Sequence, residues 1–273
     1  MLKNLGYTKN LFILPFDHRS TFEKEKFEKK QIIEGKLIIY EAFKKSIKSG
    51  ISKEESAILV DEEYGDEILQ DARENGITTI LTTEKSGQIE FDFEYGNDFG
   101  EHIKKYNPTF AKALIRFKPN TDWTKLKMLC DYCHNHGYKF LLEVLSGEST
   151  PGAQNLTNVI SDLRGSDIEP DVWKLEGMGD KTDYESIVAK IKEDGRDNVG
   201  LVILGRGENR EKVEQWLNAG KNVDGVIGFA VGRTIFWQPL LDFKNGKIGR
   251  EKAVEEICDN FLHFYKIFIT NSY

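Results

Sequence analysis

The stretch Asp171-Val172-Trp173-Lys174-Leu175-Glu176-Gly177 is short and mostly apolar, follows Pro170 and ends at a glycine. Its length and its β-branched and aromatic residues predict a strand. On a strand, Val172, Lys174 and Glu176 share one face. Burying an ammonium group in a sheet is unfavourable unless the amine is paired, neutral or used in chemistry, because desolvation penalises the charged form. Lys174 is therefore the residue that needs explaining.

Outward from this strand, short apolar runs alternate with longer amphipathic segments eight times along the chain. The expected strands are residues 11–16, 57–61, 78–82, 111–117, 140–144, 172–176, 201–204 and 225–231. The expected helices are residues 24–48, 66–75, 98–106, 123–137, 156–164, 183–194, 210–219 and 250–269. This alternation predicts a parallel sheet wrapped by helices.

Eight strand-helix units in about 250 residues is the size of a (β/α)8 barrel, the TIM barrel. An open, doubly wound sheet has a similar periodicity. However, no GxGxxG follows the first strand and no GxxxxGK phosphate loop is present. We therefore expect an α/β protein built as one (β/α)8 barrel domain over residues 1–273.

The composition narrows the function classes. Of the 273 residues, 39% are hydrophobic and 30% are charged, and the net charge is -7. This charge disfavours non-specific binding to nucleic acid or to an acidic membrane surface. No apolar run is long enough to span a bilayer, and residues 1–4 do not begin a secretory signal. We expect a cytoplasmic protein, and the oligomeric state stays open, a homo-oligomer included.

The cysteines do not indicate redox or zinc chemistry. There are three, and Cys130 and Cys133 have the CxxC spacing of some redox and zinc sites. They lie in a helix-like segment without a second cysteine pair. We expect structural cysteines.

Charged residues and glycines concentrate where the expected strands end. In a barrel, function collects at this position, in the loops that follow the strands. Any one of these residues could simply be a solvated strand end. Taken together, they form the candidate site: Asp17, Arg19, Asp61, Lys85, Lys112, Arg116, Glu143, Lys174, Gly205, Arg206, Gly232 and Arg233.

Lys174 fits the role of a nucleophile. A neutral lysine amine attacks a carbonyl carbon and forms a Schiff base. A nearby second cation, Lys112 or Arg116, would favour the neutral amine, because like charges oppose protonation. The structural alternative is an ion pair with a carboxylate, for which the candidates are Glu176, Glu143 and Asp61.

Glu143 is the expected proton shuttle. Schiff-base chemistry needs a group that moves protons within hydrogen-bonding reach of the substrate. Glu143 follows two leucines on the adjacent strand, an apolar setting that we expect to raise its pKa. The alternative is that Glu143 only pairs with Lys112 or Lys174. Asp17 and Lys112 complete the expected catalytic set.

An anion site is expected after strands seven and eight. Residues 204–209 contain Gly205 and Arg206, and residues 228–233 contain Gly232 and Arg233. Backbone N–H groups exposed by glycine and an arginine fork can hold a phosphate. Tight turns alone would explain the same glycines.

A metal-dependent site is the main alternative. Zinc sites recruit several histidines or mixed ligands, but only His18 lies at an expected strand end. The remaining histidines fall on helices or their ends: His102, His134, His136 and His263. A carboxylate-rich magnesium site formed by Asp17 and residues 61–63 stays open. Our expectation is a site without metal or cofactor.

Several ordered motifs resemble one known family, the domain of unknown function 2090. These motifs are LPFDHR (14–19), LVDEEYG (59–65), EKSGQ (84–88), FDFEYG (91–96), EPDVWKLEG (169–177), LGRG (204–207) and GFAVGRT (228–234). The likeness runs from about residue 11 to 268. That domain occurs alone or as the C-terminal half of fused bacterial 5-dehydro-2-deoxygluconokinases of inositol breakdown.

More distantly, the chain resembles tagatose-1,6-bisphosphate aldolase, a class I barrel aldolase. The resemblance implies that Lys174 forms the Schiff base and that Glu143 handles protons. It also implies substrate or phosphate contacts for Arg19, Lys112 and Arg233. The implied reaction is cleavage of 6-phospho-5-dehydro-2-deoxy-D-gluconate to dihydroxyacetone phosphate and malonate semialdehyde. Other open possibilities are another ketose phosphate, a phosphosugar isomerase, a magnesium-assisted lyase, and a non-catalytic sugar-phosphate binding protein.

Overall fold

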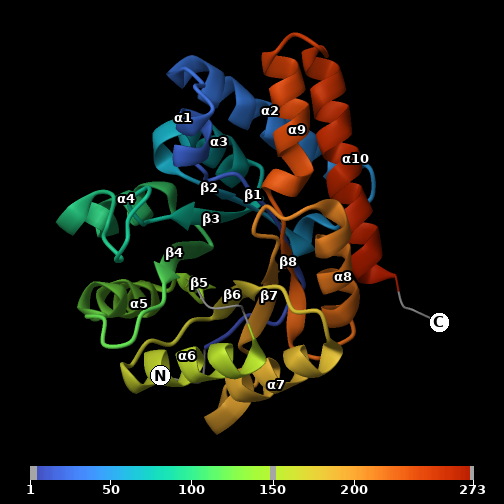
Figure 1. Ribbon diagram of the computed structural model, residues 1–273. Coiled ribbons are helices and arrows are strands. Elements are labelled where there is room, and N and C mark those ends of the chain that lie inside the picture. The colour runs from blue at the N-terminus through green and yellow to red at the C-terminus, as the bar shows by residue number, and fades with distance from the viewer. Residues whose placement is uncertain (1–4, 148–151, 271–273) are drawn as a thin grey trace.

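Eight short apolar segments pair in chain order to form a closed parallel β-barrel (Figure 1). The computed structural model describes residues 5–147 and 152–270; residues 1–4, considered above for a secretory signal, lie outside this part. The strands are β1 (Leu11–Pro15), β2 (Ser56–Val60), β3 (Thr78–Thr82), β4 (Phe110–Arg116), β5 (Lys139–Leu145), β6 (Val172–Glu176), β7 (Gly200–Leu204) and β8 (Val226–Ala230). The prediction of a (β/α)8 barrel is confirmed.

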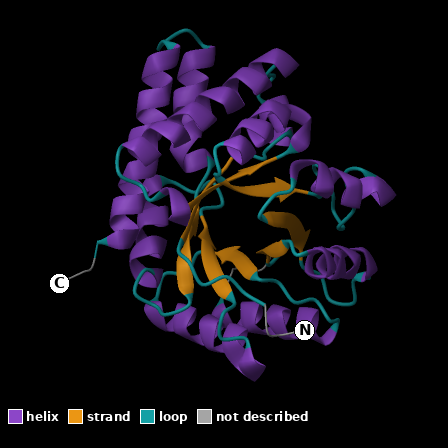
Figure 2. Cartoon of the chain, turned by 180° about the vertical axis from the view of Figure 1, so that it is seen from behind, coloured by secondary structure: helices purple, strands orange, loops and turns teal. Residues whose placement is uncertain are grey.

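Helices lie outside the ring of strands, as Figure 2 shows from behind. They are α1 (Ser20–Lys24), α2 (Lys29–Lys48), α3 (Glu62–Glu74), α4 (Phe99–Tyr106), α5 (Thr124–His136), α6 (Ala153–Gly165), α7 (Lys181–Lys192), α8 (Arg210–Gly220), α9 (Arg233–Lys244) and α10 (Arg250–Ile269). Short 3-10 turns are η2 (Lys53–Glu55), η3 (Gly96–Asp98) and η4 (Glu193–Gly195). In the described part of the chain, every helix is too short or too polar to span a bilayer.

Two helical segments differ from the expectation. The expected helix 24–48 begins only at Lys29, as α2, and residues 20–24 form the separate short helix α1, because the chain turns between them, where Lys26 has a left-handed φ of 57°. Helix α9 was not expected, since its sequence is aromatic-rich and carries Pro239 in its interior. Its N-terminus lies directly after β8, at the end of the barrel that carries the candidate site residues Gly232 and Arg233.

The lower part of the barrel interior is a hydrocarbon floor. It consists of Leu11, Ile13, Ala57, Leu59, Ile80, Phe110, Leu141, Val172, Val202 and Ala230. Side chains of a strand alternate between its two faces, so the residues two positions further along also point inward. On three neighbouring strands these residues are charged: Lys112, Glu143 and Lys174. Folding therefore stacks a charged layer directly on an apolar one.

The outer face of the strands packs against the helices in a second, larger apolar cluster. Helix α10 lies against α2, α8 and α9, and so covers the side where β8 meets β1. Gly228 permits that closure, because a Cβ there would lie 2.1 Å from the Leu11 carbonyl oxygen. The three cysteines are buried and free, as the expectation of structural cysteines requires.

Candidate active site

A cavity of about 310 Å³ opens at the carboxyl ends of the strands. Ten of the twelve expected site residues line it: Asp17, Arg19, Lys85, Lys112, Arg116, Glu143, Lys174, Arg206, Gly232 and Arg233. Gly205 lies beside this lining, and its amide donates to the Ala230 carbonyl oxygen at 3.1 Å. Strand pairing thus gathers residues that are up to 216 positions apart, from Asp17 to Arg233.

The pair formed by Lys174 and Glu143 is buried at the base of this cavity. The two residues are register partners of the β5–β6 ladder, and Lys174 Nζ donates to Glu143 Oε2 at 2.8 Å. Their exposed fractions are 2% and 6%. Amine and carboxylate are therefore held side by side, within the reach that proton transfer requires.

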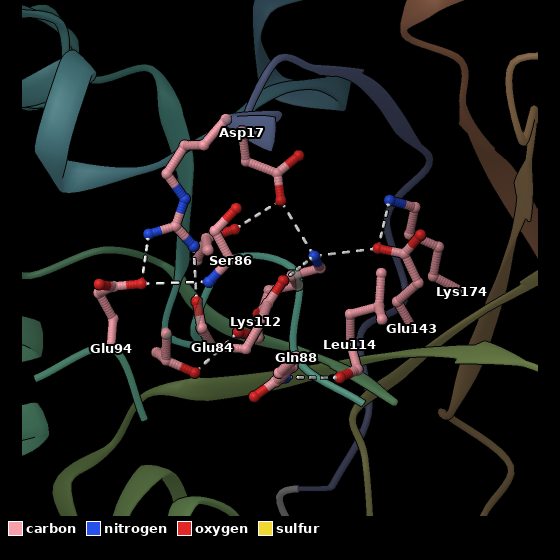
Figure 3. A network of polar contacts seen from close by, with 12 residues as sticks. Asp17, Glu84, Ser86, Gln88, Glu94, Lys112, Leu114, Glu143 and Lys174 are labelled. Atoms are coloured by element: carbon pink, nitrogen blue, oxygen red, sulfur yellow. Dashed lines mark hydrogen bonds and ion pairs between the residues drawn. The ribbon is translucent and has the colours of Figure 1, made fainter. Parts of the chain in front are cut away.

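Lys112 is the centre of the polar network that Figure 3 shows. Its Nζ lies 3.0 Å from Asp17 Oδ2, 2.5 Å from Glu84 Oε1 and 3.1 Å from Glu143 Oε2. Glu143 Oε2 is thus shared by both ammonium groups, those of Lys112 and Lys174. One buried cation holds three carboxyl groups together.

The two ammonium groups decide the charge state of the neighbouring acids. Burial alone would raise the pKa of Glu143, but Lys112 and Lys174 outweigh it and lower the pKa. Burial also opposes ionisation of Asp17, yet Lys112, His18 and Lys174 hold its pKa well below the usual range. The expectation that an apolar setting raises the pKa of Glu143 is therefore wrong. Glu143 is a carboxylate, and thus a base, at neutral pH.

The pKa of Glu84 is shifted in the opposite direction, upward. Burial raises its pKa, and the charges of Asp17 and Glu143 add to this effect, although Lys112 opposes it. Its Oε2 is buried, and within residues 5–147 and 152–270 no hydrogen-bond partner contacts it. Acids whose surroundings push their pKa values apart are suited to acid and base roles. Glu84 lines the cavity and was not in the expected catalytic set.

Arg19 is firmly held at the β1 end. Its Nη1 donates to Glu94 Oε2 at 2.6 Å, and its Nη2 donates to the Glu84 carbonyl oxygen at 2.7 Å. Burial would lower its pKa, but the charges of Asp61 and Glu94 outweigh this and raise it. The two terminal nitrogens of Arg19 are thus engaged by the protein itself, although the side chain lines the cavity.

Two arginines form another part of the cavity wall, after β7 and β8. Arg233 Nη2 donates to the Arg206 carbonyl oxygen at 2.7 Å, and Gly232 and Arg233 begin helix α9. The first N–H groups of a helix lack partners within the helix and carry a partial positive charge. With the arginines, this terminus makes a positively polarised wall that suits an anion.

His18 was not singled out as a catalytic candidate, but it lies in the same cavity. Its ring meets the edge of Phe236 on α9. Burial lowers the pKa of His18 to about 4, and Arg233 and Lys174 contribute, while Asp17 and Glu143 oppose the shift. The imidazole is therefore neutral at physiological pH.

Asp61 does not line the cavity. It accepts from the Tyr64 amide at 2.9 Å as the N-cap of α3, and it forms a buried ion pair with Lys36 of α2. Two buried charged side chains thus satisfy each other. Asp61 is therefore engaged by α2 and α3 outside the cavity lining, although its charge still acts on Arg19.

The acidic run 61–63 is also engaged by basic side chains. Asp61 pairs with Lys36, and Glu62 pairs with His102 and Lys105. Among the described residues, no group of three or more histidine, cysteine, aspartate or glutamate side chains has an arrangement that could hold a metal ion.

Several solved structures with the same fold are fructose-1,6-bisphosphate aldolases. A Schiff-base-forming fructose-1,6-bisphosphate aldolase is 15% identical, with 94% of each chain covered and a TM-score of 0.57. An archaeal fructose 1,6-bisphosphate aldolase is 13% identical, with 95% of this chain and 93% of that chain covered and a TM-score of 0.59. Another archaeal aldolase structure, with its catalytic lysine covalently bound to the carbinolamine intermediate, is 13% identical over 94% and 93% of the two chains, with a TM-score of 0.58. At these identities the likeness shows a shared fold.

Among curated proteins, none matches the chain. A family model described as "Uncharacterized protein conserved in bacteria (DUF2090)" matches residues 3–271, nearly the whole sequence. The resemblance inferred from the ordered motifs is thereby confirmed, and the chain belongs to the DUF2090 family.

Proposed function

We propose that the protein is a class I aldolase that cleaves a phosphorylated keto sugar or keto sugar acid through a Schiff base on Lys174. The observation that carries this proposal is the buried Lys174 amine, 2.8 Å from Glu143 in a cavity with a positively polarised wall. A sheltered lysine beside a carboxylate is the arrangement that Schiff-base catalysis needs. The aldolases that share the fold, one of them with a lysine carbinolamine, support it.

The proposed reaction begins when Glu143 takes a proton from the Lys174 ammonium group. The neutral amine then attacks the substrate ketone, and Glu143 returns the proton to the hydroxyl group that leaves as water. The carbinolamine that forms loses water and becomes an iminium ion. The carbon–carbon bond between the α- and β-carbons of the iminium then breaks, and its electron pair moves toward the iminium to form an enamine. Glu143, as a carboxylate, takes the proton of the hydroxyl group that becomes the aldehyde. Protonation of the enamine carbon and hydrolysis release the second product and free Lys174.

The rest of the cavity would orient the substrate by charge. We assign the phosphate to the wall formed by Arg206, Gly232 and Arg233, where a helix terminus and guanidinium groups converge. A second anionic group would meet Arg116 and Lys85, which are exposed on the opposite rim. Arg19 would contribute positive charge from a fixed position.

The substrate that we propose is 6-phospho-5-dehydro-2-deoxy-D-gluconate, cleaved to dihydroxyacetone phosphate and malonate semialdehyde. This choice rests on the family resemblance, and the two cationic regions suit its phosphate and its carboxylate. Tagatose 1,6-bisphosphate also has two anionic ends, so it is the comparison substrate. Measuring kcat/KM for both distinguishes them, and we expect the keto acid to be preferred.

Borohydride trapping tests the Schiff base. Protein incubated with dihydroxyacetone phosphate and sodium borohydride should lose activity and gain one reduced adduct at Lys174, located by peptide mass spectrometry. Lys85→Met is the matched control, because Lys85 lines the same cavity but is exposed. An adduct on Lys112 instead, or a fully active and unmodified protein, would refute the mechanism.

A further inference from the structure

Glu176 is a buried carboxylate that the proposed reaction does not use. It is 1% exposed and lies two residues after Lys174, on the same inward face of β6. A buried carboxylate is costly unless it is paired and hydrogen-bonded. Its partners therefore indicate why the chain keeps it there.

The partners of Glu176 come from the loops after the two neighbouring strands. Its Oε2 accepts from the Ser146 amide at 3.0 Å and from the Ser146 hydroxyl, directly after β5. Its Oε1 forms an ion pair with Arg206 Nη1, after β7. One carboxylate at the end of β6 thus ties together the loops of β5 and β7.

Arg206 links Glu176 to Arg233 through its main chain. The Arg206 carbonyl oxygen accepts from Arg233 Nη2 at 2.7 Å. Arg206 and Gly207 both have left-handed backbones, with φ of 52° and 78°. A Cβ on Gly207 would lie 2.6 Å from the Arg233 guanidinium carbon. The conformation of residues 206–207 therefore decides where the Arg233 guanidinium lies.

This backbone conformation needs an anchor. A non-glycine residue in the left-handed region is strained and persists only when its surroundings hold it. The side chain of Arg206 is 37% exposed, whereas its partner Glu176 is 1% exposed. The ion pair with Glu176 is thus the buried contact that fixes the Arg206 side chain and, through it, the strained turn.

We infer that Glu176 is a positioning residue that sets the phosphate-binding wall by holding Arg206 and, through the Arg206 carbonyl, the guanidinium of Arg233. The inference rests on the proposed function in one respect only, that this wall receives a phosphate group. Strand β6, which carries the reactive Lys174, would then also control how the substrate phosphate is bound. Glu176 itself would contact neither the substrate nor the reacting atoms.

Binding of inorganic phosphate tests the inference without any need for turnover. Isothermal titration of the wild type and of Glu176→Gln should show a dissociation constant raised about tenfold or more in the variant, since small displacements of a positioned group cost up to about a hundredfold. Arg206→Met should raise the constant similarly, and the double variant should be no worse than the single ones, because both break one connection. Equal phosphate affinity in wild type and Glu176→Gln, or additive losses, would overturn the inference.

Ser146→Ala is the matched control, because it removes one hydrogen bond to Glu176 and leaves the ion pair with Arg206 in place. Its phosphate affinity should stay within about twofold of wild type. If Glu176→Gln fails to fold, Glu176→Asp carries the test, because its shorter side chain withdraws the carboxylate from Arg206, and normal phosphate binding by it would also refute the inference. A wild type that binds no phosphate refutes it as well.

A second readout separates this inference from the proposed function. Borohydride trapping of dihydroxyacetone phosphate should require more ligand in Glu176→Gln, whereas trapping of unphosphorylated dihydroxyacetone should be unchanged. Wild-type protein that binds phosphate but forms no adduct with either ketone would refute the Schiff-base proposal alone. Equal slowing with both ketones would show damage to the amine and would contradict a positioning role.

Discussion

Replacing Lys112 by methionine removes a buried cation that contacts three carboxyl groups. Lys112 Nζ lies between 2.5 and 3.1 Å from oxygens of Asp17, Glu84 and Glu143, and the side chain is 1% exposed. Methionine has a similar length but no charge. The variant therefore leaves the carboxyl groups close together in a buried place, where Lys174 still pairs with Glu143.

The loss of stability should be large. Removing one partner of a buried ion pair costs about 3 to 5 kcal/mol, because the remaining charge stays buried without compensation. The three carboxyl groups can reduce this cost by taking up protons, since closely spaced carboxylates raise each other's pKa. We therefore expect Lys112→Met to lose about 3 to 5 kcal/mol of unfolding free energy at pH 7 and less in acid.

The pH dependence follows from the directions of the pKa shifts. Lys112 holds the pKa of Asp17 and Glu143 below their ordinary values, so their contribution is present above those values and is lost as the pH falls. The charges of these acids in turn raise the pKa of Lys112 well above 10.5, so its contribution is present below that pH. In Lys112→Met the raised carboxyl pKa values reverse the trend, and stability should fall between about pH 4 and pH 7.

Chemical denaturation followed by tryptophan fluorescence, at a series of pH values, measures this effect. Lys85→Met is the control, because it removes an exposed lysine of the same cavity and should change stability by about 0.5 kcal/mol or less. If Lys112→Met matched the wild type in stability at pH 7 and in its pH trend, the network in Figure 3 would not hold the charges assigned to it.

Two further predictions concern buried charges elsewhere in the structure. Lys36→Met should lose about 3 to 5 kcal/mol of unfolding free energy, measured in urea, because Asp61 is left buried and unpaired. Adding Asp61→Asn should restore most of this stability and should leave borohydride trapping unchanged. A trapping defect in the double variant would show that Asp61 belongs to the substrate site. Because the pKa of Glu84 is raised, its contribution to stability is present below its ordinary value of 4.5 and is lost as the pH rises. The stability of wild type relative to Glu84→Gln should therefore decline from about pH 4 to pH 7 in thermal melts, and a rising difference would contradict the shift.

The fold was predictable because its signals are local. Each strand is a short apolar run between turn residues, and helices of amphipathic sequence separate the strands. The charged layer was predictable for a related reason, since Lys112, Glu143 and Lys174 each lie two positions after an apolar inward residue. Parallel neighbouring strands place such residues at similar heights, so their meeting in one cavity follows from the alternation.

The partners within the cavity were harder to predict. Glu84 shares its strand face with Thr82, a signal that alternation could have used, but its contact with Lys112 depends on how the loop after β3 folds back. Asp61 has the same sequence signature as the true lining residues. Its side chain turns away because Lys36, 25 residues earlier, and the start of α3 offer it better partners. Such choices depend on tertiary packing, which the local pattern does not contain.

The register of β5 and β6 gives the pairing of Glu143 with Lys174 a further meaning. Because the two residues are opposite each other in the ladder, their separation is set by main-chain hydrogen bonds rather than by flexible loops. Deleting or inserting a single residue in either strand would turn one of the two groups to the outside of the barrel. The geometry of this pair therefore depends on the barrel itself, whereas the connecting segments can change without separating Glu143 from Lys174.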